Sequence, residues 1–397
     1  MNTTAYIGND GADETKKTVL SNVGDISVKA SDDVDLKSNA GGAAVEIGSG
    51  GVAGSLSAAV EVLDKNVRAS IGKVTIAGES LNVSASNTGN LLTTANGVAL
   101  AISTYGAGFT GNASESIVNY NTDAHIANGS NITLADDLYV DADSRFSHIG
   151  EATGIAGSTL ASVGLSNDTT VFNAKTNAYI GDSAVIIVNN ETKNEYVDSE
   201  KVWSGVSVTA DSDVDITSAV VTGGASGIVA VNGGVGVNVI DTSTKAYIGA
   251  SAQVTANGTA NDGGVKVAAT DNTKISGGSG GAAIAVVGTG GAVNVNDITK
   301  STLAYIGHNA DVLNAGNTDI IAKSNEQLYN VTVQAVGGAV GLAGAVAVHN
   351  FDVLTKAYAD SGVDILDADG VAGSITGGKV TVEAEHQGYL LLNQHTL

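Results

Sequence analysis

The segment Ala292-Val293-Asn294-Val295-Asn296, followed by Ala304-Tyr305-Ile306-Gly307, is one copy of a unit that recurs along the whole chain. The tetrapeptide Ala-Tyr-Ile-Gly also occupies residues 5–8, 178–181 and 246–249. Including degenerate versions, seven imperfect repeats of about 53–68 residues start near Ala5, Ala69, Ala124, Ala178, Ala246, Ala304 and Ala357. Self-similarity at such a period is typical of repeat architectures.

A second pattern, hydrophobic-x-hydrophobic-x-Ala, lies in every repeat. Its copies begin at Ile26, Leu81, Leu138, Val206, Val265, Thr318 and Val380. The distance from this pattern to the next tetrapeptide is nearly constant at 39–43 residues, whereas the preceding interval varies from 12 to 28. Coils of a solenoid keep their length and insertions emerge at one corner. We therefore predict that residues 1–397 form a single continuous solenoid.

The residues within these segments alternate with a period of two. Between residues 206 and 216, Val and Ile alternate with Ser, Thr and Asp. This alternation is typical of strands with one buried face, and the caps and spacings of amphipathic helices are absent. Gly, Asn and Asp punctuate the segments where corners require a positive φ. We expect an all-β parallel β-helix.

The repeat length also predicts the shape. A unit of about 55 residues fits roughly three coils of ~20 residues, which gives an elongated rod of roughly 20 coils and ~95 Å. The small residues at 277–288 would let opposite walls approach closely. The first and last copies are both cut within the repeat. We therefore expect an excised fragment of a longer protein.

Composition narrows the classes of partner. The chain has 52 Gly, no Pro, no Cys and a formal net charge of −23. Such a charge repels phosphate groups, so we expect no nucleic-acid partner, and no apolar run is long enough for direct membrane insertion. The absence of Cys excludes disulfides and thiol catalysis. The six His and the Gly-rich runs match no metal or nucleotide motif, so we predict a protein that is not an enzyme and has no cofactor other than an optional Ca²⁺.

Units of the form Gly-Ala-Val-x-Val-Asn, Ala-Tyr-Ile-Gly and Val-x-Val-x-Ala resemble those of large filamentous adhesins related to fusobacterial leukotoxin. They are also similar to the passenger regions of some autotransporters. Residues 292–307 and their counterparts in the other repeats carry the match. The resemblance implies a right-handed β-helix, secreted to the outer surface of a bacterium with two membranes, where it acts in cell adhesion and virulence.

We therefore expect a structural and adhesive stalk that contacts a host cell-surface or matrix protein, a glycan or other bacteria, with self-association as a further option. Two alternatives remain open. A polysaccharide lyase or hydrolase would need an acid/base pair in a cleft. A calcium-dependent glycan-binding module would need a row of oxygen ligands.

Two sets of acidic residues are candidates for calcium. Asp211, Asp213 and Asp215 alternate along one strand and should share its outer face. A second set lies five residues before the tetrapeptide: Asp64, Asn119, Asn173, Asp241 and Asp352. We interpret the second set as corner residues that bond their own backbone, with a recurring calcium ligand as the alternative.

Aromatic residues supply the candidates for partner contact. Tyr6, Tyr179, Tyr247, Tyr305 and Tyr358 follow the Ala of the tetrapeptide, so we predict that they face outward and stack at one-repeat intervals, where they could bind a glycan. The longest variable interval, Val188 to Val206, carries the only Trp of the chain, Trp203, with Tyr196 nearby. A large aromatic side chain among polar groups is a common recognition anchor.

Overall fold

The computed structural model describes residues 1–8, 18–190, 204–257, 264–314, 316–367 and 379–396, and every regular element in these ranges is a β-strand. No helix that could span a membrane occurs among them. The strands form three sheets of seven strands each, and all neighbouring strands run parallel. An all-β parallel β-solenoid is thus confirmed.

Two sheets consist of long strands. Sheet A contains β1 (Asn2–Ile7), β4 (Gly51–Ile71), β7 (Gly106–Ile126), β10 (Ala161–Ile180), β13 (Val229–Ile248), β16 (Val287–Ile306) and β19 (Val340–Ala359). Sheet C contains β3 (Ile26–Gly48), β6 (Leu81–Ser103), β9 (Leu138–Ser158), β12 (Gly205–Ala225), β15 (Gly264–Ile284), β18 (Thr318–Gly337) and β21 (Val380–Thr396).

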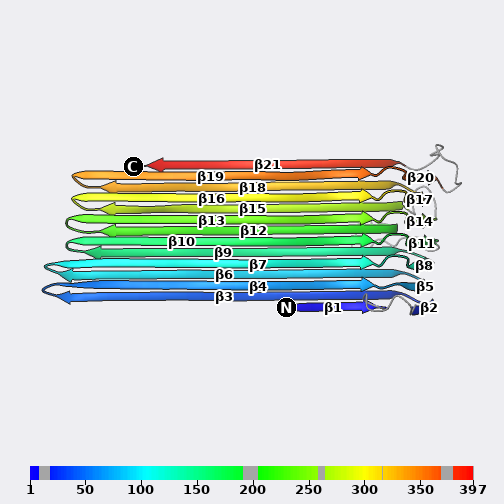
Figure 1. Cartoon of the computed structure of the whole chain (residues 1–397), viewed down its shortest axis with the longest axis horizontal. Helices are drawn as coiled ribbons and strands as arrows, with labels where there is room; N and C mark the ends of the chain where they lie inside the picture. The colour runs from blue at the N-terminus through cyan, green and yellow to red at the C-terminus, as the bar shows by residue number, and fades with distance from the viewer. Residues whose placement is uncertain (9–17, 191–203, 258–263, 315, 368–378, 397) are drawn as a thin grey trace.

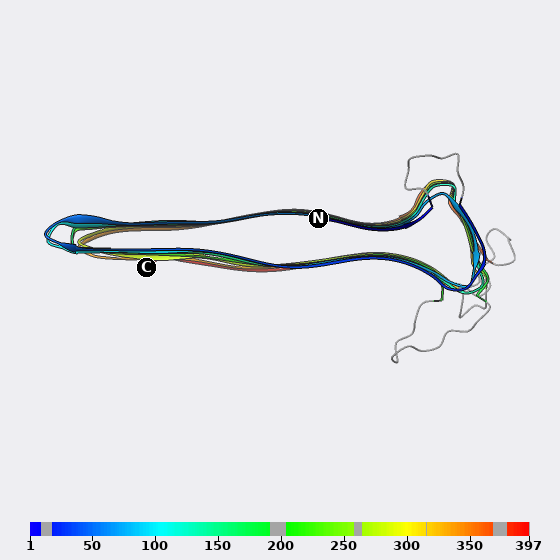
Figure 2. The same cartoon turned by 90° about the horizontal axis from the view of Figure 1, so that it is seen from below.

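Sheet B consists of short strands. It contains β2 (Thr18–Val23), β5 (Val74–Gly78), β8 (Asn131–Leu134), β11 (Val185–Val188), β14 (Gln253–Ala256), β17 (Asp311–Asn314) and β20 (Asp364–Asp367). Each coil runs along sheet C, turns sharply, returns along sheet A and closes through sheet B (Figure 1). Figures 1 and 2 together show that the coils wind in a right-handed sense.

The number of coils differs from the prediction. Each repeat forms one coil, so the chain has seven coils and not roughly 20. The reason is strand length: β4 and β12 each have 21 residues, about 65–70 Å, so one circuit uses the whole repeat. Seven stacked strands span only about 29 Å along the solenoid axis. The longest dimension therefore follows the strands, as Figure 1 shows, rather than the axis of the solenoid.

In cross-section the coil has two parts, which Figure 2 shows. In the head, sheet B closes one end of sheets A and C around an aliphatic core. This core includes the repeated tetrapeptides, and Ala69, Ala124 and Ala178 lie in register on consecutive strands. In the blade, which extends to the opposite end, sheets A and C face one another directly and join through tight turns.

The residues that face inward explain the difference between head and blade. Val206, Val208 and Ala210 are buried in the head, as their alternation predicted. Phe146 and Phe172 stack with ring centroids 4.5 Å apart where the head meets the blade. Towards the tip of the blade the inward residues become small, and a Cβ on Gly164 would lie 2.8 Å from the carbonyl oxygen of Gly223. This close approach bears out the prediction drawn from the small-residue stretches.

One corner of the head requires left-handed backbone. The third residue after the Ile of the tetrapeptide has a φ of 53–71° in five coils, namely Gly129, Ser183, Ser251, Asn309 and Gly362. Gly adopts this conformation without a steric penalty and Asn tolerates it better than most residues. The predicted positive-φ corner is therefore present, although two coils place Ser there.

Candidate functional site

The two aromatic residues predicted as partner contacts belong to the interval from Val188 to Val206. Trp203 and Tyr196 lie outside the described residues, as does most of the interval that contains them. Only its two ends, up to Asn190 and from Ser204, are described, and a hydrogen bond from Ser204 Oγ to Asn190 Oδ1, 2.7 Å long, joins them. Their role in partner contact stays a prediction.

The three aspartates predicted to bind calcium lie on the outer face of β12, as expected. Arg145 is the in-register neighbour of Asp213, and Lys274 Nζ lies 3.0 Å from Asp215 Oδ2. Partial burial and the carboxylates of Asp141 and Asp143 raise the pKa of Asp211. No group of three or more Asp, Glu or His side chains placed to hold a metal ion occurs within the described ranges. Calcium binding by this row stays a prediction.

The residues five positions before the tetrapeptide are not at corners, so that prediction is wrong. Asp64, Asn119, Asn173 and Asp241 lie well inside the long strands of sheet A and are in register on four consecutive coils. We call these four residues the amide ladder. They do not cap turns, because the strands continue for seven residues beyond them into the head.

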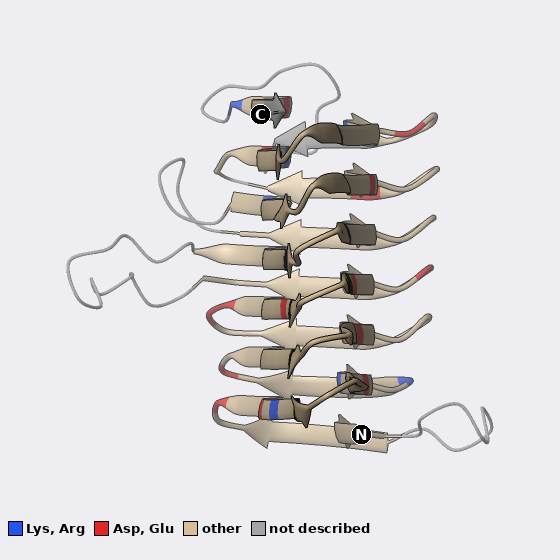
Figure 3. Cartoon of the chain, turned by 90° about the vertical axis from the view of Figure 1, so that its left-hand side faces the viewer, with Lys and Arg blue, Asp and Glu red and all other residues tan. Residues whose placement is uncertain are grey.

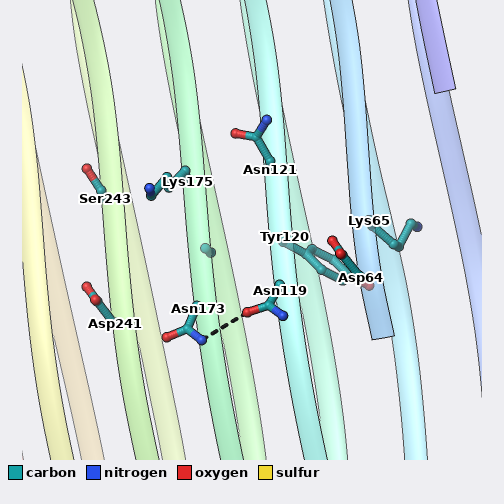
Figure 4. A pocket seen from close by; sticks show the side chains of 10 residues that line it. Asp64, Lys65, Asn119, Tyr120, Asn121, Asn173, Lys175, Asp241 and Ser243 are labelled. Carbon is teal, nitrogen blue, oxygen red and sulfur yellow. Dashed lines mark hydrogen bonds between the residues drawn. The ribbon is translucent and has the colours of Figure 1, made fainter. Parts of the chain in front are cut away.

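The amide ladder lines a shallow groove of about 540 Å³ across sheet A (Figure 4). Asn173 Nδ2 donates to Asn119 Oδ1 over 3.0 Å, as the dashed line in Figure 4 shows. Asn121, Lys175 and Ser243 line the same groove. Its surface therefore offers amide donors and acceptors, carboxylates and one exposed ammonium group, which are the groups that bind sugar hydroxyls or a polar peptide.

The two carboxylates of the groove are too far apart for glycoside hydrolysis. Asp64 and Asp241 lie on strands β4 and β13, three strand spacings apart, which corresponds to about 14 Å. The carboxylate pairs of glycosidases are separated by roughly 5–9.5 Å. The groove is consequently better suited to binding than to this chemistry.

A continuous aromatic stack runs along the outer face of sheet A in the head. The rings of His125, Tyr179, Tyr247, Tyr305 and Tyr358 are nearly parallel, with neighbouring centroids 4.7, 4.8, 4.9 and 5.1 Å apart. The predicted stacking is confirmed for these four tyrosines. Tyr6 is the exception, because Ser70 is its in-register neighbour.

The stack changes what the tyrosines can bind. Each inner ring is covered on both faces by its neighbours, and Lys356 Nζ lies 4.1 Å from the ring centroid of Tyr358. A sugar that stacks on an aromatic side chain needs a free ring face. The stack therefore presents only ring edges and hydroxyls to a ligand. Burial raises the pKa of Tyr305 to about 12, so its hydroxyl is protonated and able to donate.

We expect Tyr247→Ala to lower the free energy of unfolding by roughly 1–3 kcal/mol, because two ring contacts of about 0.5–1.5 kcal/mol each are lost. Tyr6→Ala is the matched control: it removes a ring from the same position in the first coil, next to Ser70, and should have a much smaller effect. Urea denaturation measures both variants. Equal losses in the two would contradict a stabilising role for the stack.

Two lysines buried between the sheets form ion pairs that the sequence did not predict. Lys300 Nζ lies 2.9 Å from Asp271 Oδ1 and 2.7 Å from Glu326 Oε1, and the side chain of Lys300 is fully buried. Lys65 Nζ lies 2.6 Å from Asp32 Oδ1. The in-register neighbours show that Lys65 and Lys300 occupy the same position four coils apart. Both lysines lie four residues before the Ala of their tetrapeptides, but only knowledge of the coil length reveals which carboxylates they meet.

These features define the class of the chain: a repetitive parallel β-solenoid with long strands, an outer polar groove and an outer aromatic stack. No protein-family model, curated protein or solved structure matches it.

Proposed function

We propose that the chain is a stalk segment of a secreted bacterial surface adhesin, exposed outside the cell, which holds contact surfaces away from the cell and binds a host or bacterial surface through them. One observation carries the proposal: seven coils stack in parallel, and the long strands of sheets A and C keep their register, so that the same outward position recurs from coil to coil. Such a stack is rigid along its axis and displays like groups about 4.8 Å apart.

The amide ladder is the surface that we assign to partner contact. Its Asn and Asp side chains are exposed, carry both donors and acceptors, and lie in a groove. A row of similar polar groups on a rigid support binds a repetitive ligand multivalently, so that weak single contacts add up to firm attachment. A polysaccharide or a repetitive matrix protein has this character.

Attachment of the purified chain tests the proposal. Beads coated with the chain are expected to adhere to host cells, to a matrix protein or to other bacteria, and Asn119→Ala/Asn173→Ala should reduce adherence several-fold while leaving the circular dichroism spectrum unchanged. Asn90→Ala/Asn272→Ala is the control, because it removes two exposed amides from the opposite sheet. Absence of adherence by the parent chain to every one of these surfaces would count against the adhesive function.

A further inference from the structure

In the blade, apolar side chains face outward and polar side chains face inward. On the outer face of sheet A, large apolar side chains are exposed from the turns to the amide ladder. We call this surface the valine face, and its exposed members are Val52, Leu56, Val60, Val62, Phe109, Ile117, Leu165, Val235, Val287, Val340, Leu342, Val346 and Val348. Soluble proteins expose single apolar residues routinely, but a contiguous apolar sheet face marks an interaction site.

The interior of the blade is correspondingly polar. Asn238 Nδ2 donates to Asn296 Oδ1 over 2.8 Å, and Asn296 Nδ2 donates to Asn294 Oδ1 over 2.9 Å. Asp168 is fully buried, and its Oδ2 accepts a hydrogen bond from Ser218. The strands alternate, so the polar set that packs inside leaves the Val and Leu set outside. Because the polar set already fills the interior, the apolar set has no place within this chain.

Charge is nearly absent from the valine face. Among the described residues of the blade part of sheet A, only Glu115 and Asp297 combine a charge with an outward position, since Glu61 and Asp168 face the interior. The turns that join sheet C to sheet A, such as 104–105 and 226–228, contain no charged residue (Figure 3). Most of the net charge of −23 therefore lies elsewhere on the molecule, and the two carboxylates on this face oppose its close approach only weakly.

The valine face is also flat. A Cβ on Gly233 would lie 3.2 Å from Leu165 Cδ2, and one on Gly111 would lie 2.8 Å from Leu56 Cδ2. Each leucine thus spreads over a glycine of the neighbouring strand, which levels the surface. Flat faces of β-branched and small residues pack against one another at about 10 Å, as the inner faces of β-sandwiches do.

The area of the valine face suits a stable dimer. About eleven residues along each strand and six long strands give roughly 35 Å by 24 Å, or about 850 Å². The largest apolar patch of an ordinary monomer is about 300–600 Å². Two such faces in contact would bury about 1,700 Å², within the range for standard specific interfaces.

We propose that the valine face binds the valine face of a second copy of the chain, in an isologous pair. The same patch serves both partners because a two-fold axis relates them. A lipid occupant is disfavoured: the outermost strands of sheet A, β1 and β19, each have only one neighbour in the sheet, and hydrocarbon would leave the free backbone groups of such edges unsatisfied. Pairing would make a stalk thicker. The proposal of pairing does not depend on whether the amide ladder binds a host surface.

Light scattering on the full chain tests the pairing. The parent is expected to have about twice the monomer mass of 39.2 kDa, and Leu165→Lys should give the monomer mass. Val221→Lys is the matched control. Leu165 and Val221 lie on the middle strands of sheets A and C and are 46% and 51% exposed, so the control adds the same charge to the opposite face and should remain a dimer.

Crosslinking of cysteine variants tests the pairing independently of any folding defect in the lysine variants. Because the chain has no Cys, Leu165→Cys introduces a single thiol near the middle of the valine face, where a short bismaleimide should join two copies, whereas Val221→Cys should stay uncrosslinked. A monomeric parent would overturn the proposal, whether or not it floats with phosphatidylcholine vesicles. Dimers that Leu165→Lys and Val221→Lys affect equally would overturn it too.

Discussion

Lys300→Met is expected to lower the free energy of unfolding by about 3–5 kcal/mol, the cost of removing one partner from a buried ion pair. Lys300 Nζ lies between Asp271 Oδ1 and Glu326 Oε1, and all three side chains are buried. Methionine fills the same space but leaves Asp271 without a cation and Glu326 with only the imidazole of His386, whose Nδ1 lies 2.9 Å from Glu326 Oε2. Urea denaturation at neutral pH measures the loss.

Neutralising the whole cluster is the control for Lys300→Met. Asp271 accepts hydrogen bonds from Thr242 and Thr244, each 2.9 Å long, and an asparagine oxygen can accept the same bonds. Lys300→Met/Asp271→Asn/Glu326→Gln should therefore recover most of the lost stability, because buried pairs are worth little against neutral groups of similar shape. A triple variant as unstable as Lys300→Met would contradict this explanation.

The second large effect is a dependence of stability on pH. Burial raises the pKa of Asp168 to about 6 from its ordinary value of 3.8, although hydrogen bonds from Ser218 and Ser114 lower it in part. The unfolded chain therefore releases this proton at lower pH than the folded chain. Between about pH 4 and 6 Asp168 binds more proton in the folded state than in the unfolded state, so its own contribution to stability falls as pH rises, by about 3 kcal/mol between pH 4 and 8.

Asp168→Asn tests this assignment. The variant should be more stable than the parent at pH 8 by up to about 3 kcal/mol, and the difference should vanish near pH 4. Ser218→Ala removes a donor that favours the charged form, so it should steepen the pH dependence. Denaturation curves at several pH values decide, and an Asp168→Asn variant whose stability follows that of the parent at every pH would show that Asp168 is not the responsible group.

The repeats predicted the solenoid because each repeat marks the same position on successive coils. The Ala and Ile of each tetrapeptide face the core of the head, and the Tyr between them faces outward, so a period of two together with the repeat spacing was sufficient. The stacking of Tyr179 on Tyr247 followed from the same argument. These are local patterns whose meaning does not depend on how the rest of the coil closes.

Strand length could not be predicted from the sequence. The wrong prediction that the residues of the amide ladder lie at corners followed from the unknown strand length. Usual coil lengths suggested three short-stranded coils in each repeat, with Asn119 and Asp241 at corners. Strands of 20–23 residues are far longer than the usual five or six, and no residue in the sequence forbids the shorter division. The ion pair of Lys300 with Asp271 depends on the same missing quantity, since the residues are 29 apart and meet only across one long coil.

The outward position of the apolar side chains in the blade was not predicted, and the reason is a different one. Alternation shows that Val235, Val237 and Val239 share a face, but the usual rule assigns the apolar face to the interior. Here Gly236 and Asn238 occupy the interior, because opposite walls approach too closely for larger side chains and the amides bond to one another along the coils. The head sets the inner face: Ala246 and Ile248 face its core, and the alternation along β13 carries that face through Asn238 and Gly236.

A distance between two spin labels tests the one-coil repeat most directly. Asn66→Cys and Ser301→Cys place labels on the outer face of sheet A at equivalent positions four coils apart, and the chain has no other Cys. Pulsed electron resonance, with unlabelled chain in excess to suppress distances between copies, should give about 19 Å. Three coils in each repeat would place the labels about 58 Å apart, and that result would contradict the structure and the surfaces built on it.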